Sequence, residues 1–187
     1  MKRLQRSAIA FLLILSMVWT CAPAIAGEAS APMTESYYDC YSPILLSIHA
    51  EFNDSFGTAD YLDYALYDID GDGVLELIVL AGTCEADFVR RIYTVADGRA
   101  QYAGETFGGH STLYECPEGG FYNMMAHMGY EEVYRVTYTN RVVSEELLLS
   151  KDVGEYGDYD SPGADMNTSA ITDFGLLWEA PERMGSQ

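Results

Sequence analysis

Short apolar segments separated by turn signals dominate the middle of this chain and restrict its fold class. The clearest turn signals are Asp97-Gly98, which suits a tight hairpin turn, and the run Pro117-Glu118-Gly119-Gly120. The segments between the turns are rich in β-branched and aromatic residues and have the length of short strands. The expected strands are 64–69, 75–81, 88–95, 99–104, 112–115, 121–126, 133–139 and 142–149.

Short strands joined by short turns favour an antiparallel meander of about eight strands in an α+β, mainly β fold. Three architectures fit this pattern: a sandwich, a partial barrel and propeller-like blades. A helix should precede the strands, because apolar residues there recur at three- and four-residue spacing and form one stripe. The stripe consists of Tyr37, Tyr41, Ile44, Leu45, Ile48 and Phe52. We expect this N-terminal helix to pack on one face of the sheet.

Two starting points for the helix fit the sequence. Ser42-Pro43 would begin it with serine as the N-cap and proline at the first helical position. Alternatively, the helix begins near Ser36 and Pro43 forms a kink inside it.

The end of the chain differs in composition from the predicted strands. Residues 151–167 carry Asp, Glu, Gly and Tyr with almost no aliphatic side chains, which predicts an extended or mobile acidic segment. Residues 171–178 are apolar again and predict a short helix capped by Thr168 or Ser169. We therefore expect one domain at 37–150, followed by an acidic C-terminal segment at 151–187.

The first 26 residues have the order of a secretory signal peptide. Three basic residues are followed by an apolar stretch at 8–19 and by Ala24-Ile25-Ala26 as a cleavage site, and a linker would follow at 27–36. The stretch is too short for a membrane span, and no later segment is apolar for long enough. We expect a secreted, extracellular bacterial protein. The alternative is a lipid anchor through Cys21, which the bulky Trp19 and the Thr20 before it disfavour.

Acidic residues strongly outnumber basic ones. The chain has 29 Asp and Glu against 10 Lys and Arg, a net charge of −19, and removal of the three basic leader residues would make it −22. Such a surface repels nucleic acid and anionic membranes. We therefore exclude nucleic acid as a partner and expect an extracellular protein or polysaccharide.

Three cysteines follow the leader, namely Cys40, Cys84 and Cys116. An oxidising compartment allows one disulfide among them and leaves one thiol over. The sequence does not decide the pair. Cys84–Cys116 is favoured, because both residues lie at the ends of expected strands.

The run from Asp68 to Glu76 carries the most specific chemistry and predicts a calcium site. Calcium binds oxygen ligands that a loop supplies in sequence order. Alternating carboxylates can turn inward together, and Gly73 permits the sharp backbone turn that closes such a loop. The expected ligands are Asp68, Asp70, Asp72, Glu76 and the backbone carbonyl of Val74. The alternative is a polar Asx/Gly turn without an ion, but such a turn gains nothing from four acids.

The loop departs from the EF-hand pattern at its end. The twelfth position, which is a bidentate Glu in an EF-hand, is Val79 here and lies inside an expected strand. Since no helices flank the loop, calcium is not expected to open a helix pair. The loop resembles instead the Asp-x-Asp-Gly-Asp-Gly-x-x-Glu/Asp loops between strands of integrin-type FG-GAP and VCBS repeats, although this chain holds one copy and those families hold several.

A wider resemblance is to a largely uncharacterised family of secreted proteins of Gram-positive bacteria. The runs that carry it are Tyr64-Ala65-Leu66-Tyr67-Asp68-Ile69-Asp70-Gly71-Asp72-Gly73, Glu76-Leu77-Ile78-Val79, Gly82-Thr83-Cys84-Glu85-Ala86-Asp87, Gly109-His110-Ser111 and His127-Met128-Gly129-Tyr130-Glu131. The resemblance covers roughly residues 37–150. It implies an exported module stabilised by calcium and supplies no activity.

Two functions are consistent with these sequence patterns. The preferred one is a secreted, noncatalytic calcium-binding module that recognises an extracellular partner through its sheet or loops, with no residue in a catalytic role. The alternative is a small extracellular hydrolase that uses Cys84, His110 or His127. These three residues lack the close spacing of a metal or nucleophile motif, so the hydrolase requires the fold to bring them within hydrogen-bond reach beside a cleft.

Overall fold

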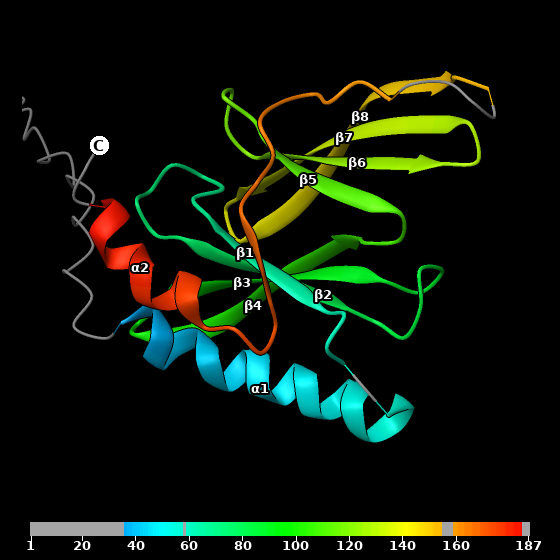
Figure 1. Cartoon of the computed structure of the whole chain (residues 1–187). Helices are drawn as coiled ribbons and strands as arrows, with labels where there is room; N and C mark the ends of the chain where they lie inside the picture. Colours follow the sequence, from blue (N-terminus) through cyan, green and yellow to red (C-terminus); the bar gives the residue numbers. More distant parts are fainter. Residues whose placement is uncertain (1–35, 58, 155–158, 185–187) are drawn as a thin grey trace, which may run out of the picture. The chain divides into compact units, whose positions relative to one another are not determined.

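Nine antiparallel strands in two sheets form the framework of the computed structural model, which describes residues 36–57, 59–154 and 159–184 (Figure 1). The first sheet contains, in spatial order, β4 (Arg99–Phe107), β3 (Val89–Ala96), β2 (Glu76–Ala81), β1 (Asp63–Tyr67) and β9 (Thr168–Ala170). The second sheet contains β5 (Ser111–Glu115), β6 (Phe121–His127), β7 (Tyr130–Thr139) and β8 (Val142–Asp152). Strands β1 to β4 and β5 to β8 pair in chain order. The predicted meander is therefore confirmed, as two sheets and not as a closed barrel.

An apolar core lies between the two sheets. Ile78 and Ile92 from the first sheet pack in one buried cluster with Phe121 and Val136 from the second. All six residues of β2 are buried, because this strand lies in the middle of its sheet and both of its faces are covered. Two-sided burial explains why β2 is continuously apolar from Leu77 to Ala81 and does not alternate.

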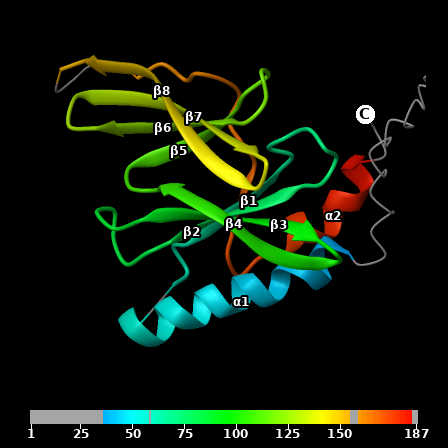
Figure 2. The ribbon, with the colours of Figure 1, turned by 180° about the vertical axis from the view of Figure 1, so that it is seen from behind.

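The two sheets approach each other where β4 passes β8 (Figure 2). Gly104 of β4 lies against the side chain of Val143, and a Cβ at this glycine would come within 2.8 Å of it. The glycine also has a φ of 152°. A residue without a side chain is therefore required where the two strands come closest.

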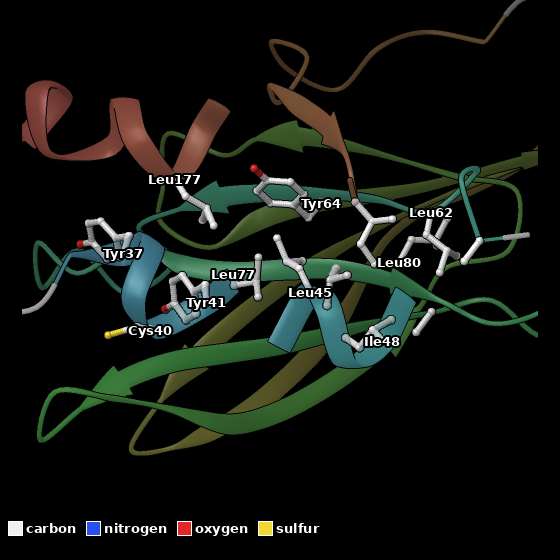
Figure 3. Close-up of a cluster of buried hydrophobic side chains, with 14 of the residues drawn as sticks. Tyr37, Cys40, Tyr41, Leu45, Ile48, Leu62, Tyr64, Leu77, Leu80 and Leu177 are labelled. Carbon is white, nitrogen blue, oxygen red and sulfur yellow. The ribbon is translucent and has the colours of Figure 1, made fainter. Parts of the chain in front are cut away.

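The N-terminal helix α1 (Tyr37–Phe56) covers the outer face of the first sheet. Figure 3 shows Tyr41 and Leu45 of the helix beside Leu77 of β2, and all three are fully buried. Five of the six residues in the predicted stripe are buried, and Ile44 is partly buried. The prediction of an amphipathic helix packed on the sheet is confirmed.

The helix begins earlier than Ser42. Ser36 is the N-cap: its Oγ accepts a hydrogen bond from the backbone N of Asp39, whose carboxylate accepts one from the backbone N of Ser36. This reciprocal capping box satisfies two N–H groups that a helix start would leave free. Ser42 and Pro43 lie inside the helix, so the start at Ser42 is wrong and the start near Ser36 is confirmed.

The C-terminal segment contributes to the domain. Strand β9 pairs with β1, and helix α2 (Gly175–Met184) lies beside α1, where Trp178 stacks on Tyr38 with 4.2 Å between ring centroids. The described residues beyond 150, which we expected to follow the domain, therefore complete its sheet and its helical layer.

The expected caps of the last helix are wrong. Thr168 and Ser169 belong to the extended strand β9, where they pair with Ala65 and Tyr64. The helix begins later, at Gly175, and the Asp173 side chain accepts a hydrogen bond from the backbone N of Gly175. Two polar residues and an alanine in an edge strand carry no apolar periodicity, which is why the sequence did not reveal β9.

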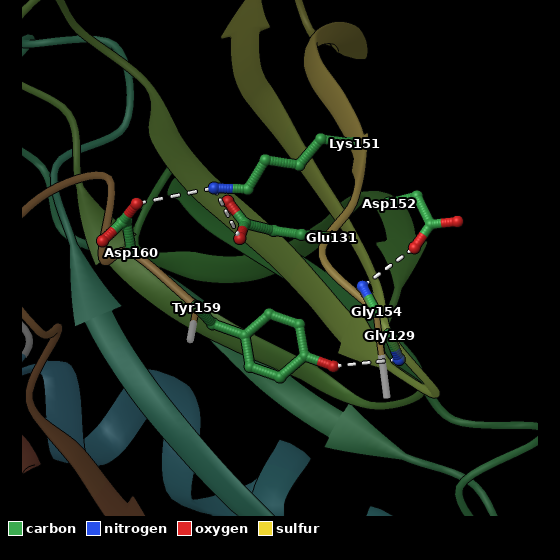
Figure 4. A network of polar contacts seen from close by, with 7 residues as sticks. All are labelled: Gly129, Glu131, Lys151, Asp152, Gly154, Tyr159 and Asp160. Atoms are coloured by element: carbon green, nitrogen blue, oxygen red, sulfur yellow. Dashed lines mark hydrogen bonds and ion pairs between the residues drawn. The ribbon is translucent and has the colours of Figure 1, made fainter. Parts of the chain in front are cut away.

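Part of the acidic segment is fixed to the second sheet (Figure 4). The Lys151 ammonium lies 3.1 Å from the carboxylate of the fully buried Glu131 and 3.5 Å from that of Asp160. The Tyr159 hydroxyl accepts a hydrogen bond from the backbone N of Gly129 at 3.2 Å. Buried charge is tolerated when it is paired, so Lys151 allows the sheet to bury Glu131 and attaches the segment that follows.

The three cysteines of the domain are free thiols, two buried and Cys84 exposed. The predicted Cys84–Cys116 disulfide is therefore wrong. Cys84 follows β2 of the first sheet, whereas Cys116 follows β5 of the second sheet and donates a hydrogen bond from its thiol to Glu118. Both residues lie at strand ends as expected, but the strands belong to different sheets.

The signal peptide 1–26, including Cys21, and nearly all of the linker 27–36 lie outside the described residues, so these stay predictions. Within the described ranges, the structure contains no helix that is both long and apolar enough to span a bilayer.

Two tyrosine hydroxyls attach α1 to the residue before β2. Leu75 donates its backbone N–H to the Tyr37 hydroxyl, and its carbonyl accepts from the Tyr41 hydroxyl, both at 2.8 Å. The Tyr41 hydroxyl also lies 3.2 Å from the Tyr93 carbonyl. The helix therefore fixes the backbone at the point where the chain enters the central strand.

We expect Tyr41→Phe to lower the free energy of unfolding by roughly 1–2 kcal/mol, because it removes a buried hydrogen-bond donor. Urea denaturation measures this change. Tyr38→Phe is the matched control, since the Tyr38 hydroxyl forms no hydrogen bond with any described residue, and its stability should equal that of the wild type. Equal losses in both variants would contradict the role given to Tyr41.

Candidate metal centre

The acidic loop connects two central strands whose pairing fixes its ends. Tyr67, the last residue of β1, pairs with Glu76, the first residue of β2. Gly73 has a φ of 87°, in the left-handed region, and a Cβ there would meet no atom within 4 Å. The backbone conformation, and not lack of space, is therefore what favours glycine, as the sequence predicted for the turn of this loop.

Three of the predicted ligands converge. Oxygen atoms of Asp68, Asp70 and Glu76 all lie within 4.8 Å of one another. Asp70 is exposed, Asp68 is half-buried and Glu76 is completely buried. Asp72 is outside this cluster, and its Oδ1 accepts a hydrogen bond from the backbone N of Val74 at 2.7 Å.

Backbone hydrogen bonds hold the loop in shape. The Asp68 carboxylate accepts from the backbone N of Gly71 at 2.8 Å and from that of Gly73 at 3.1 Å. Asp70 accepts from the backbone N of Asp72 at 3.2 Å. These Asx-type contacts would also suit a polar turn without an ion. Because a carboxylate has about four lone-pair sites, they leave acceptor capacity for a cation.

Glu76 is the residue that a polar turn does not explain. Its Oε2 accepts from the backbone N of Ile69 at 2.9 Å, and its Oε1 accepts from the Thr94 hydroxyl at 3.0 Å. Burial, together with the negative charges of Asp70 and Asp72, raises the pKa of this carboxyl to about 8. A fully buried acid without a basic partner is rare. It is costly in its charged form unless a cation approaches it.

The pKa of the Asp70 carboxyl is shifted in the same direction. Burial raises its pKa, and the neighbouring Asp72 adds to the shift. No Lys or Arg forms an ion pair with these carboxylates within the described part of the chain. The loop therefore concentrates negative charge that the protein itself does not neutralise.

The residues present fit a hard divalent cation. Calcium prefers carboxylate and carbonyl oxygens and takes about six to eight of them. The loop supplies carboxylates in chain order, with the Val74 carbonyl as a further expected ligand. Val79, at the twelfth position, is buried inside β2 and offers no side-chain oxygen. Any ion in the loop would thus keep coordination positions for water or another molecule.

The fold brings the two predicted histidines together. The rings of His110 and His127 stack with 3.7 Å between centroids and 11° between planes. Glu85 accepts a hydrogen bond from the backbone N of His110 at 2.8 Å and lies 3.5 Å from its Nδ1. The two histidines lie 17 residues apart, so only the pairing of β5 with β6 reveals their contact.

Cys84 lines a cavity of about 510 Å³ together with Ser111 and Arg90. Glu85, which contacts His110, lines the same cavity. None of the hydrogen bonds among the described residues connects the Cys84 thiol to either imidazole. The geometry therefore lacks the Cys–His pair that the alternative hydrolase would need.

Comparisons with models of protein families, with curated proteins and with solved structures give no match. The resemblances noted in the sequence therefore stay predictions.

Replacement of Glu76 by glutamine tests the burial of this acid in metal-free protein. A raised pKa means that the folded state binds the proton more tightly, so the wild type is destabilised as the pH rises from 4.5 to about 8. Glu76→Gln keeps the shape and has no charge to lose. Between about pH 4 and 7, in chelator, we expect its stability to rise relative to the wild type by roughly 3 kcal/mol.

Urea denaturation of both proteins across this pH range measures the difference. Parallel stability profiles for the wild type and Glu76→Gln would show that the Glu76 carboxyl titrates as an ordinary exposed acid.

Proposed function

We propose that this protein is an exported, noncatalytic calcium-binding module in which the ion stabilises the β1–β2 connection. The proposed ligands are Asp68, Asp70, Asp72, Glu76 and the Val74 carbonyl. The observation that carries the proposal is the approach of three carboxylates within 4.8 Å, one of them completely buried. Export is proposed from the leader-like start of the sequence.

Electrostatics supports a bound cation. Carboxylates this close repel each other when they are charged, and the interaction is strongest where burial excludes water. A divalent cation among them turns the net electrostatic repulsion between the carboxylates into a net attraction and keeps Glu76 ionised. The strong negative charge of the chain also favours cations over anions at its surface.

The position of the loop supports a stabilising role over a sensing one. Glu76 opens the central strand β2 and bonds to Thr94 of β3, so an ion here would link the loop to two neighbouring strands. The strands β1 and β2, and not a pair of helices, flank the loop. Extracellular calcium is millimolar, and sites with dissociation constants of about 10⁻⁴–10⁻³ M are then largely filled.

Thermal unfolding with calcium and with chelator tests the proposal. Calcium at about ten times its dissociation constant should add about 1.4 kcal/mol of stability. For a domain of this size that corresponds to a rise in the unfolding midpoint of roughly 3–6 °C. Asp70→Ala should abolish the rise, because it removes a proposed ligand. The substitution should disturb the metal-free loop little, since Asp70 contributes only one weak backbone contact to it.

Glu146→Gln is the matched control, because it also removes one negative charge but lies exposed on β8. This variant should keep the full response to calcium. A wild-type midpoint that is the same in calcium and in chelator would refute calcium binding at the loop.

A further inference from the structure

A polar cavity of about 330 Å³ opens beside the acidic loop. Its walls come from the loop, from β3 and β4, and from β7 with the turn that follows it. The residues that matter here are Asp70, Asp72, Thr94, Tyr102, Tyr138 and Arg141. A volume of this size is within the range of small-molecule sites and accommodates one sugar unit.

Tyr138 brings to this cavity a hydroxyl without a partner in the part of the protein that the structure describes. The side chain is 8% exposed, and its hydroxyl forms no hydrogen bond with any described residue. Burial raises the pKa of the hydroxyl, and the charges of Glu76 and Asp70 raise it further, which places the hydroxyl in the electric field of the loop. The hydroxyl oxygen is not among the buried polar atoms, so it is open to the cavity. A polar molecule there would bond to it in place of water.

Arg141 is the cation of the cavity wall. It lies in the two-residue turn between β7 and β8, and its guanidinium forms no ion pair within the described residues. Both turn residues are left-handed, with φ of 53° at Asn140 and 65° at Arg141. Hairpin turns of this kind favour glycine at the second position. An arginine at this position is therefore unfavourable for the backbone, and it faces a cavity whose other wall is acidic.

The incomplete coordination of the proposed ion indicates which chemical group the ligand carries. The bidentate glutamate that would complete a calcium loop is replaced by the buried Val79. A carboxylate brought by a ligand has the two oxygens that are missing. The same carboxylate is the group that an arginine fork binds best.

We infer that the cavity binds an acidic sugar, whose carboxylate lies between the loop cation and Arg141 and whose hydroxyl bonds to Tyr138. This inference rests on the proposed calcium binding. Thr94 and Tyr102 favour a hydroxylated ligand over a bare carboxylate, because they add a hydroxyl and a 57% exposed aromatic ring to the wall. The ligand class is therefore a uronic acid unit, such as those of acidic polysaccharides.

Protein-detected NMR titration with glucuronate, at a fixed and saturating free calcium concentration, tests the inference. Wild-type resonances of the cavity residues should shift, and Arg141→Gln should weaken glucuronate binding by about tenfold or more, because it removes a charge-assisted contact. Tyr138→Phe should weaken it by about threefold or more through the lost hydrogen bond. Both variants should bind calcium as the wild type does.

Arg99→Gln is the matched control, since Arg99 is an exposed arginine outside the cavity, and it should leave glucuronate binding unchanged. Glucose or acetate binding as tightly as glucuronate would overturn the assignment of an acidic sugar. Glucuronate binding that ignores both cavity variants would overturn the site. Calcium binding without any response to glucuronate would refute this inference alone, whereas absence of calcium binding would refute the proposed function together with it.

Discussion

The burial of the Glu76 carboxylate is the constraint around which the loop is organised. The strand period places this side chain on the same face of β2 as Ile78, which packs between the two sheets. The carboxylate therefore reaches the loop from the interior of the protein and not from its surface. Ile69 and Thr94 give it one hydrogen bond to each oxygen, which fixes its orientation but leaves its charge uncompensated.

The other elements of the fold converge on the same point. Helix α1 fixes Leu75 through two tyrosine hydroxyls on the outer face of the sheet. On the inner face, the second sheet contributes Tyr138, whose hydroxyl lies in the field of the loop acids. The loop is thus supported from the helix side and open to the cavity on the sheet side. If the proposed ion is bound, this asymmetry would let a ligand approach it without displacing the helix.

Local patterns predicted most of the fold. The stripe from Tyr37 to Phe52 identified a helix, and turn signals such as Asp97-Gly98 identified hairpins, because both depend on neighbouring residues. Features that depend on distant residues were not predictable. Strand β9 has two polar residues and an alanine, and it exists because β1 offers it a free edge. The division into two sheets separates Cys84 from Cys116, and no local signal indicates on which side of that division a turn will lie.

The site shows the same division between local and distant information. Spacing alone identified Asp68, Asp70 and Glu76, but not that Glu76 is buried or that Tyr138 and Arg141 lie across a cavity from the loop. Strand geometry also explains why the motif ends at its ninth residue. A strand rises about 3.3 Å per residue, so Val79 lies roughly 10 Å beyond Glu76 and cannot turn back to the loop. A calcium ion in this loop would therefore take its last ligand of the motif from Glu76, the first residue of β2, and the rest of its coordination sphere would face the cavity.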